Sequence, residues 1–242
     1  AFIFGLSVTN TATGVFNVNA GTLDWSGDGP HTNSGQIDID SGATLRLSQS
    51  VTHGVGSSIT GAGSVLFSGG THTFTDQLQV TGPLGLSGGT ASFNQTRSFA
   101  QAFPISGGTL TGSGDLTFDA GLTWSGGTLA GSGRVIIPVG QTLAYTGGGL
   151  SRSINNFGTF NFGGSGSLIF DAGAILTNKQ GAVLNHNSTG NLHAAGDGPV
   201  EAFINEGVYN KNGGGAQAFI FGLSVTNTAT GVFNVNAGTL DW

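Results

Sequence analysis

Cysteine and methionine are both absent from the 242-residue chain, and lysine and arginine together number only six. Without cysteine and methionine the chain lacks the side chains that oxidise most readily, which suits a long-lived protein exposed to air or water. The six basic residues are scattered and the net charge is −6, so the chain has no electrostatic footprint for nucleic acid. No apolar run approaches the roughly eighteen residues that a membrane helix needs. We therefore expect neither nucleic-acid binding nor membrane insertion in this segment.

Charged residues are also scarce, at 7% of the chain against about 25% in an average globular protein. Glycine is abundant, with 46 residues, and 37% of the chain is hydrophobic. That apolar fraction is enough to bury a core, which argues against a disordered linker. The glycines separate short apolar segments, a pattern typical of an all-β protein.

One long sequence occurs twice. Ala1–Trp25 returns unchanged at Ala218–Trp242, an offset of 217 residues. The hypothesis is that residues 1–217 form one full tandem repeat and that residues 218–242 begin the next identical repeat. An end copied deliberately into an engineered chain would leave the same trace and stays open. Because the chain starts inside the repeated element, we expect any export or anchoring signal to lie outside this window.

Within the 217 residues, short apolar alternations are joined by glycine-rich turns in units of 17 to 28 residues. The tetrapeptide SGGT marks the repeat turns with a strict 19-residue spacing, at Ser68, Ser87, Ser106 and Ser125. Three short strands in a unit of this size make one coil of a parallel β-helix, which must stack on its neighbours to bury its apolar side. The pattern predicts a right-handed β-solenoid of about ten three-strand coils per repeat, because the rigid hexapeptide rhythm of the left-handed form is absent. An antiparallel sandwich is the alternative. Ten coils spaced by ~4.8 Å would give a shaft of ~48 Å per repeat.

A second regularity is an asparagine followed within a few residues by glycine, just before a strand. The asparagines are Asn156, Asn178, Asn205 and Asn227, and the glycines are Gly158, Gly181, Gly207 and Gly231. Stacked asparagines can form an amide ladder along the axis, and both residue types tolerate the left-handed backbone of a sharp corner. Both readings are structural.

The SGGT units, the Asn-Gly strand starts and the charge-poor composition together resemble the passenger repeats of bacterial filamentous-haemagglutinin-type adhesins. They are similar as well to the shafts of other giant tandem-repeat surface proteins of bacteria. The resemblance covers the whole repeat as a pattern. It implies a β-helical shaft that is exported and displayed at the cell surface or outside the cell, and it carries over no binding residues.

Candidate chemistry is sparse. Asp38 and Asp40 lie two apart on one expected strand, but the only basic residue near them in sequence is Arg46. Catalysis on a carboxylate pair needs more than this, so we expect no enzyme. His186 and His193 lack a third ligand nearby in sequence, so we expect no metal site and no cofactor.

These observations favour a structural function, as a repeat unit of an extended extracellular fibre or adhesin stalk. Its partner would be itself, through adjacent identical repeats along the axis, with lateral bundling favoured by the low charge. The alternative is a repeated adhesin module that binds glycans or host surfaces through inter-strand loops. Two long insertions, Ser48–Gly63 and Ala195–Gly207, are the candidate loops.

Overall fold

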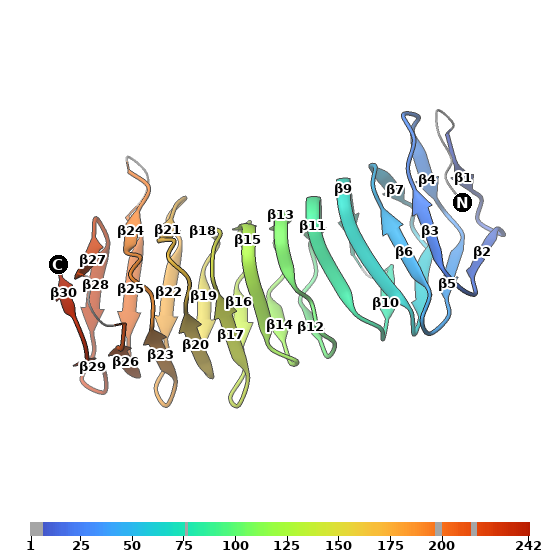
Figure 1. Cartoon of the computed structure of the whole chain (residues 1–242). Helices are drawn as coiled ribbons and strands as arrows, with labels where there is room; N and C mark the ends of the chain where they lie inside the picture. The colour runs from blue at the N-terminus through green and yellow to red at the C-terminus, as the bar shows by residue number, and fades with distance from the viewer. Residues whose placement is uncertain (1–6, 76, 197–199, 214–216) are drawn as a thin grey trace.

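The computed structural model describes residues 7–75, 77–196, 200–213 and 217–242, which form thirty strands and no helix. The strands stack side by side into one elongated shaft that runs from β1 to β30 (Figure 1). Every strand pair in the described residues is parallel. The prediction of an all-β parallel solenoid is confirmed, and the alternative of an antiparallel sandwich is wrong. No helix in this part of the chain could cross a membrane.

Each coil has three faces, which the chain visits in a fixed order. The first face holds eleven strands, one per turn. They are β3 (Thr22–Trp25), β6 (Thr44–Leu47), the first halves of β9 (Ser64–Phe74), β11 (Leu84–Phe93), β13 (Ile105–Thr111) and β15 (Leu122–Ala130), then β17 (Thr142–Tyr145), β20 (Thr159–Phe162), β23 (Val183–His186), β26 (Val208–Lys211) and β29 (Val232–Val235).

The second face follows each first-face strand around a corner. It comprises β1 (Thr9–Asn10), β4 (His31–Asn33), β7 (Val51–His53), the second halves of β9, β11, β13 and β15, then β18 (Gly149–Ser151), β21 (Leu168–Phe170), β24 (Leu192–Ala194), β27 (Gln217–Phe221) and β30 (Thr239–Asp241). Regular pairing is interrupted between β7 and β9, but the rings of His53 and Phe74 lie 4.6 Å apart and place the two strands in one column.

The third face closes the coil. It comprises β2 (Val15–Val18), β5 (Gln36–Ile39), β8 (Ser58–Gly61), β10 (Leu78–Val80), β12 (Arg97–Phe99), β14 (Leu116–Phe118), β16 (Val135–Ile137), β19 (Ile154–Asn156), β22 (Ile175–Asn178), β25 (Ala202–Asn205) and β28 (Ser224–Asn227). Between β10 and β12 the backbone ladder is replaced by side chains. Arg97 donates to the carbonyl of Leu78, and Gln101 Nε2 donates to the carbonyl of Val80 at 3.1 Å.

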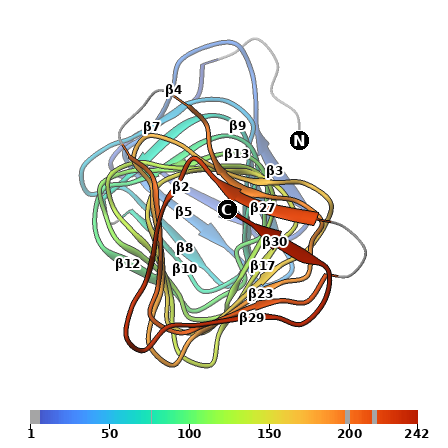
Figure 2. The same ribbon diagram turned by 90° about the vertical axis from the view of Figure 1, so that its left-hand side faces the viewer.

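The solenoid is right-handed. In Figure 2 the C-terminal end faces the viewer, and the chain runs anticlockwise from β27 along the left side to β29 as it approaches. This is the hand that right-twisted strands favour in parallel crossovers.

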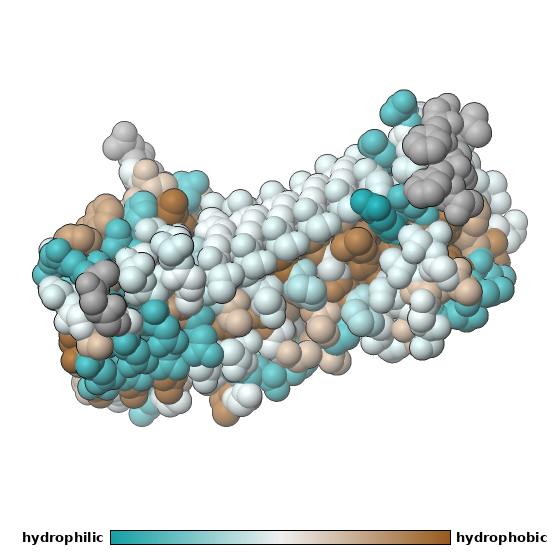
Figure 3. Space-filling model, in the orientation of Figure 1, coloured by the Kyte–Doolittle hydropathy of each residue, from teal (hydrophilic) through white to brown (hydrophobic). Residues whose placement is uncertain are grey.

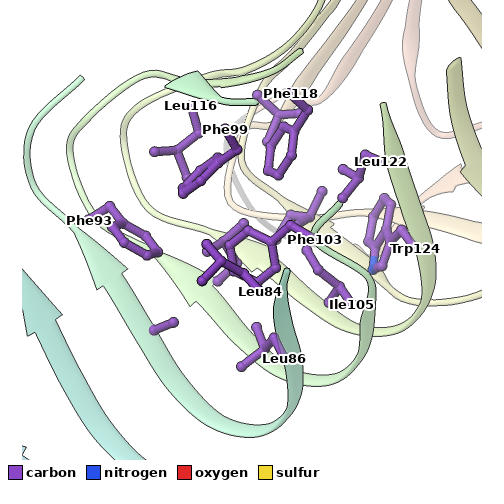
Figure 4. Packing of buried hydrophobic residues seen from close by; sticks show 14 of the residues in the cluster. Leu84, Leu86, Phe93, Phe99, Phe103, Ile105, Leu116, Phe118, Leu122 and Trp124 are labelled. Carbon is purple, nitrogen blue, oxygen red and sulfur yellow. The ribbon is translucent and has the colours of Figure 1, made fainter. Parts of the chain in front are cut away.

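The core is a column of apolar side chains along the axis, produced by the period-two alternation of the strands. Inward residues of successive coils stack directly, as in the Phe74–Phe93 ring pair at 5.5 Å and the Phe99–Phe118 pair at 5.2 Å. Phe103, from a corner between β12 and β13, fills the space between Phe93, Phe99 and Phe118 (Figure 4). Because each coil is only one strand thick, its apolar side chains are buried only when coils lie above and below.

The segment Ser48–Gly63 is not a loop. It contains β7 and β8, whose inward residues Val51 and Ile59 are buried. The prediction of an insertion was wrong because the polar Ser and Gly residues around these strands concealed the alternation. The unit from Gln36 to Gly63 therefore holds four strands, β5 to β8, where the other units hold three face positions. In the second expected loop, Ala195–Gly207, residues 197–199 lie outside the described residues and residues Ala202–Asn205 form β25.

Candidate functional site

The corner after the third face carries a ladder of buried asparagines. Asn156, Asn178, Asn205 and Asn227 occupy the same register in β19, β22, β25 and β28. The Nδ2 of each of the first three donates to the Oδ1 of the next asparagine at 2.9 Å, and Asn227 Nδ2 donates to the carbonyl of Gly231 at 3.0 Å. The same three also donate to a backbone carbonyl of the next coil, at 3.0–3.2 Å. The structure thus brings all four predicted asparagines together as an axial chain of hydrogen bonds.

A ladder of the same kind lies at the other end of the shaft, on β1 and β4 of the second face. Asn10 Nδ2 donates to Asn33 Oδ1 at 2.8 Å and to the carbonyl of Gln36 at 3.1 Å. Asn10 and Asn33 were not predicted from the sequence, although both carry the Asn-to-Gly spacing. Asn10 is the counterpart of Asn227 in the repeated sequence.

The glycines beside the ladder have two different roles. At Gly158, Gly207 and Gly231 a Cβ would lie 2.2–2.4 Å from a backbone carbonyl of the preceding coil, so only glycine lets the coils approach. Gly181 instead has φ +83° and open space around it, which makes it a turn residue outside this stack. None of the four asparagines has a positive φ. Their role is therefore the side-chain ladder and not a left-handed corner.

The SGG turns form a second stacked corner, between the first and second faces. Ser68, Ser87 and Ser125 each direct Oγ to a carbonyl of the preceding coil, at 3.3–3.4 Å. A Cβ on the glycine after Ser87 or Ser106 would lie 2.5 Å from the carbonyl of the serine one coil below. The second glycine of each turn has φ near +70°. The motif is therefore fixed by coil-to-coil contact, and it produces the pale, even band along the middle of the shaft in Figure 3.

Two further asparagine ladders lie on the outer surface, and neither was predicted from the sequence. Asn161, Asn185, Asn210 and Asn234 are linked by side-chain hydrogen bonds of 2.9–3.1 Å. Asn187, Asn212 and Asn236 are linked at 2.8–3.1 Å. They belong to the hydrophilic area over the β23, β26 and β29 end of the shaft (Figure 3). The available signal was the asparagine in third place of successive strands, as in TFNF, VLNH and VYNK.

Polar side chains buried inside the shaft form hydrogen bonds, mostly to backbone carbonyls. His186 is fully buried, with Nε2 2.8 Å from the carbonyl of Gly190 and Nδ1 2.5 Å from the Tyr209 hydroxyl. Since a carbonyl only accepts, Nε2 carries the proton and Tyr209 donates to Nδ1. Burial lowers the pKa of His186 to about 4, with Lys211 acting in the same direction. His186 is therefore neutral and satisfied, a structural group rather than a metal ligand.

Buried cations cap carbonyls in the same way. Arg152 is 1% exposed and donates through Nε to the carbonyl of Gly133 at 2.9 Å and through Nη1 to that of Ala130 at 3.2 Å. Lys211 Nζ donates to the carbonyls of Ser188 and Gly213. Burial lowers the pKa of both side chains.

Asp38, one of the two carboxylates considered for catalysis, makes a contact between neighbouring coils. Asp38 accepts a hydrogen bond from Thr60 Oγ1 at 3.0 Å, which is an ordinary coil-to-coil contact. In these parts of the chain no three His, Asp or Glu side chains converge on a metal position. The surface hollow lined by Leu78, Gln95 and Arg97 is open to solvent.

Comparison of the chain with protein-family models, with curated proteins and with solved structures finds no match. Its function therefore has to be argued from the stacking of its own coils.

Proposed function

We propose that the chain is a structural repeat unit of an extended extracellular fibre or cell-surface adhesin stalk, built by end-to-end stacking of identical β-helical repeats. The proposal takes its extracellular setting from the resemblance to filamentous-haemagglutinin-type adhesins. Its physical basis is independent of that resemblance and lies in the two ends of the shaft.

The observation that carries the proposal is that the repeated sequence uses opposite edges in its two copies. In the first copy, β1, β2 and β3 pair with the strands that follow them, β4, β5 and β6. In the second copy, the same residues form β28, β29 and β30 and pair with the strands that precede them, β25, β26 and β27. Each copy leaves unpaired the edge that the other copy uses. A coil of this sequence in the middle of an array would have both edges paired.

The side chains agree with the backbone. Asn227 Oδ1 accepts from Asn205 in the second copy, and Asn10 Nδ2 donates to Asn33 in the first. One asparagine placed in an array would do both and would continue the buried ladder without a break. Open sheet edges invite aggregation, and an array pairs them with the strands of the next repeat.

The test uses chains with one, two and four copies of residues 1–217, each ending in residues 218–242. We expect electron microscopy to show unbranched rods that lengthen by about 50 Å per added repeat. As a control, Phe233→Pro at the first junction of a two-repeat chain removes a ladder donor and an inward ring, and should give two short rods joined by a hinge. Separate compact particles in the unmodified chains would overturn the proposal.

One observation favours the alternative of a glycan-binding module. The rings of His193 and Phe221 stack in parallel at 4.8 Å on the outer side of β24 and β27, and Phe221 is 46% exposed. Exposed ring faces are a common platform for sugars. A screen of immobilised glycans against the one-repeat chain, with Phe221→Ser as the matched variant, tests it. Retention that the variant loses would support the alternative, and equal retention or none would reject this platform.

A further inference from the structure

The two copies of the repeated sequence lie on different faces of the solenoid. In the first copy β1, β2 and β3 occupy the second, third and first faces in that order. In the second copy the identical strands β28, β29 and β30 occupy the third, first and second faces. Every strand of the sequence has thus moved forward by one face.

The shift follows from the number of strand positions in a repeat. In the described residues 27 strands precede β28, and four of them, β9, β11, β13 and β15, each span two faces. The 217-residue repeat therefore passes 31 face positions, which is ten turns and one third. The extra position comes from the four-strand unit between Gln36 and Gly63. The prediction of about ten coils is refined by this third of a turn.

The repeated sequence forms the same kind of strand pairing on either face. The sequence VFNV pairs with its neighbours in parallel register whether it lies on the third face as β2 or on the first face as β29. The hydrogen-bond pattern of the ladder is also preserved. Asn205 donates to Asn227 and to the carbonyl of Val232, and Asn10 donates to Asn33 and to the corresponding carbonyl of Gln36. The open C-terminal edge therefore fits one occupant, the residues that follow Trp25 in a second copy of the repeat.

We propose that each repeat in the array is rotated by one third of a turn about the fibre axis relative to the repeat before it. This inference rests on the array proposed above and specifies its geometry. Each surface feature, including the His193–Phe221 pair and the outer asparagine ladders, is then displayed in three directions. A given direction recurs after three repeats, which hold 31 coils and span about 149 Å.

The rotation has a mechanical consequence. The shaft is bowed, with its concave side uppermost in Figure 3. Identical bows added in one direction would curl an array into an arc or a ring. A third of a turn between successive bows distributes them around the axis, so the array grows straight as a shallow screw.

The test places a small globular tag in the turn at Val139, which is 81% exposed, in every repeat of a nine-repeat array. Tomography should show tags leaving the fibre in three directions, with the same direction recurring about every 149 Å. A matched array tagged only in every third repeat should show a single row. Any gradual twist of the solenoid can be measured within one repeat and subtracted.

The outcomes separate the two proposals. Straight fibres with all nine tags in one row would overturn the rotation and leave the stalk intact. Strings of separate particles would overturn the stalk, and the rotation with it. Tags in three rows would support both.

Discussion

The buried asparagine ladder should contribute much more to stability than the ladder on the surface. We expect Asn178→Ala to be strongly destabilising, because this side chain makes three hydrogen bonds between coils. Nδ2 donates to Asn205 Oδ1 at 2.9 Å and to the carbonyl of Val208 at 3.0 Å, and Oδ1 accepts from Asn156 at 2.9 Å. Asn156, Asn178 and Asn205 are all 0% exposed, so water cannot replace the lost partners.

The magnitude follows from these contacts. A net contribution of about 1 kcal/mol for each hydrogen bond gives a loss of about 3 kcal/mol, and acceptors left unsatisfied would raise it. The matched control is Asn185→Ala in the following strand, where the side chain also makes three hydrogen bonds to asparagines of adjacent coils, at 3.0, 3.1 and 3.5 Å. Because Asn185 is only partly buried, water can take over its partners and the loss should be about 1 kcal/mol or less.

The assay is urea denaturation of the 242-residue chain and its two variants, followed by circular dichroism. Midpoints and slopes should be compared together, because a stacked-repeat protein can unfold in more than one step. Equal losses in the two variants, or a loss below about 1 kcal/mol for Asn178→Ala, would refute the reasoning that burial makes the ladder strong.

Two other perturbations test the packing of the shaft. In β11, Gly88→Ala should cost about 1–3 kcal/mol of stability, because its Cβ would lie 2.5 Å from the carbonyl of Ser68. Gly85→Ala in the same strand is the control: its Cβ meets only a leucine methyl at 3.1 Å, so the change should be nearly neutral. A larger loss for Gly85→Ala than for Gly88→Ala in thermal melts would contradict this account. The pKa of His186, lowered to about 4 when folded, means that the unfolded chain binds the proton more tightly. The contribution of His186 to stability should therefore be present in full above pH 6.5 and should fall by up to about 3 kcal/mol as the pH drops toward 4, in addition to the losses from His53 and His72, whose pKa values burial also lowers. In urea denaturation at a series of pH values, His186→Gln should reduce this loss of stability with falling pH. The same pH dependence in the variant would contradict the assignment to His186.

The fold could be predicted from the sequence because the spacing of the apolar residues indicates it. Alternating apolar residues at short, variable steps allow strands to stay in register while corners absorb extra residues. The Asn156-to-Asn227 series was visible for a similar reason, since each asparagine precedes a glycine by two to four residues just before a strand.

The outer ladders and the strands β7 and β8 have a weaker signal in the sequence and were missed. An outward polar residue in a strand, such as Asn185, has the sequence appearance of any solvated side chain. Only stacking shows that Asn161 and Asn210 lie within hydrogen-bond distance of it. The strands β7 and β8 are three and four residues long and are surrounded by Ser and Gly. A counting scheme based on residues per unit treats such a segment as a loop, although it adds a face position.

That added position changes the face on which each strand would lie when the sequence repeats. A repeat of thirty positions would return every residue to its own face, and an array would have one side of constant composition. With 31 positions, the sequence that starts a repeat must stack correctly on a different face when it recurs at the start of the next repeat. The residues that do so are those with little face preference: VFNV alternates inward and outward on either face, and the asparagine at the corner needs only another asparagine and a carbonyl in the next coil. Charged side chains would make such a change of face costly, because each would need its partner to move with it. The scarcity of charge in this chain is therefore consistent with a shaft in which each strand of the repeat lies on all three faces in turn along successive repeats.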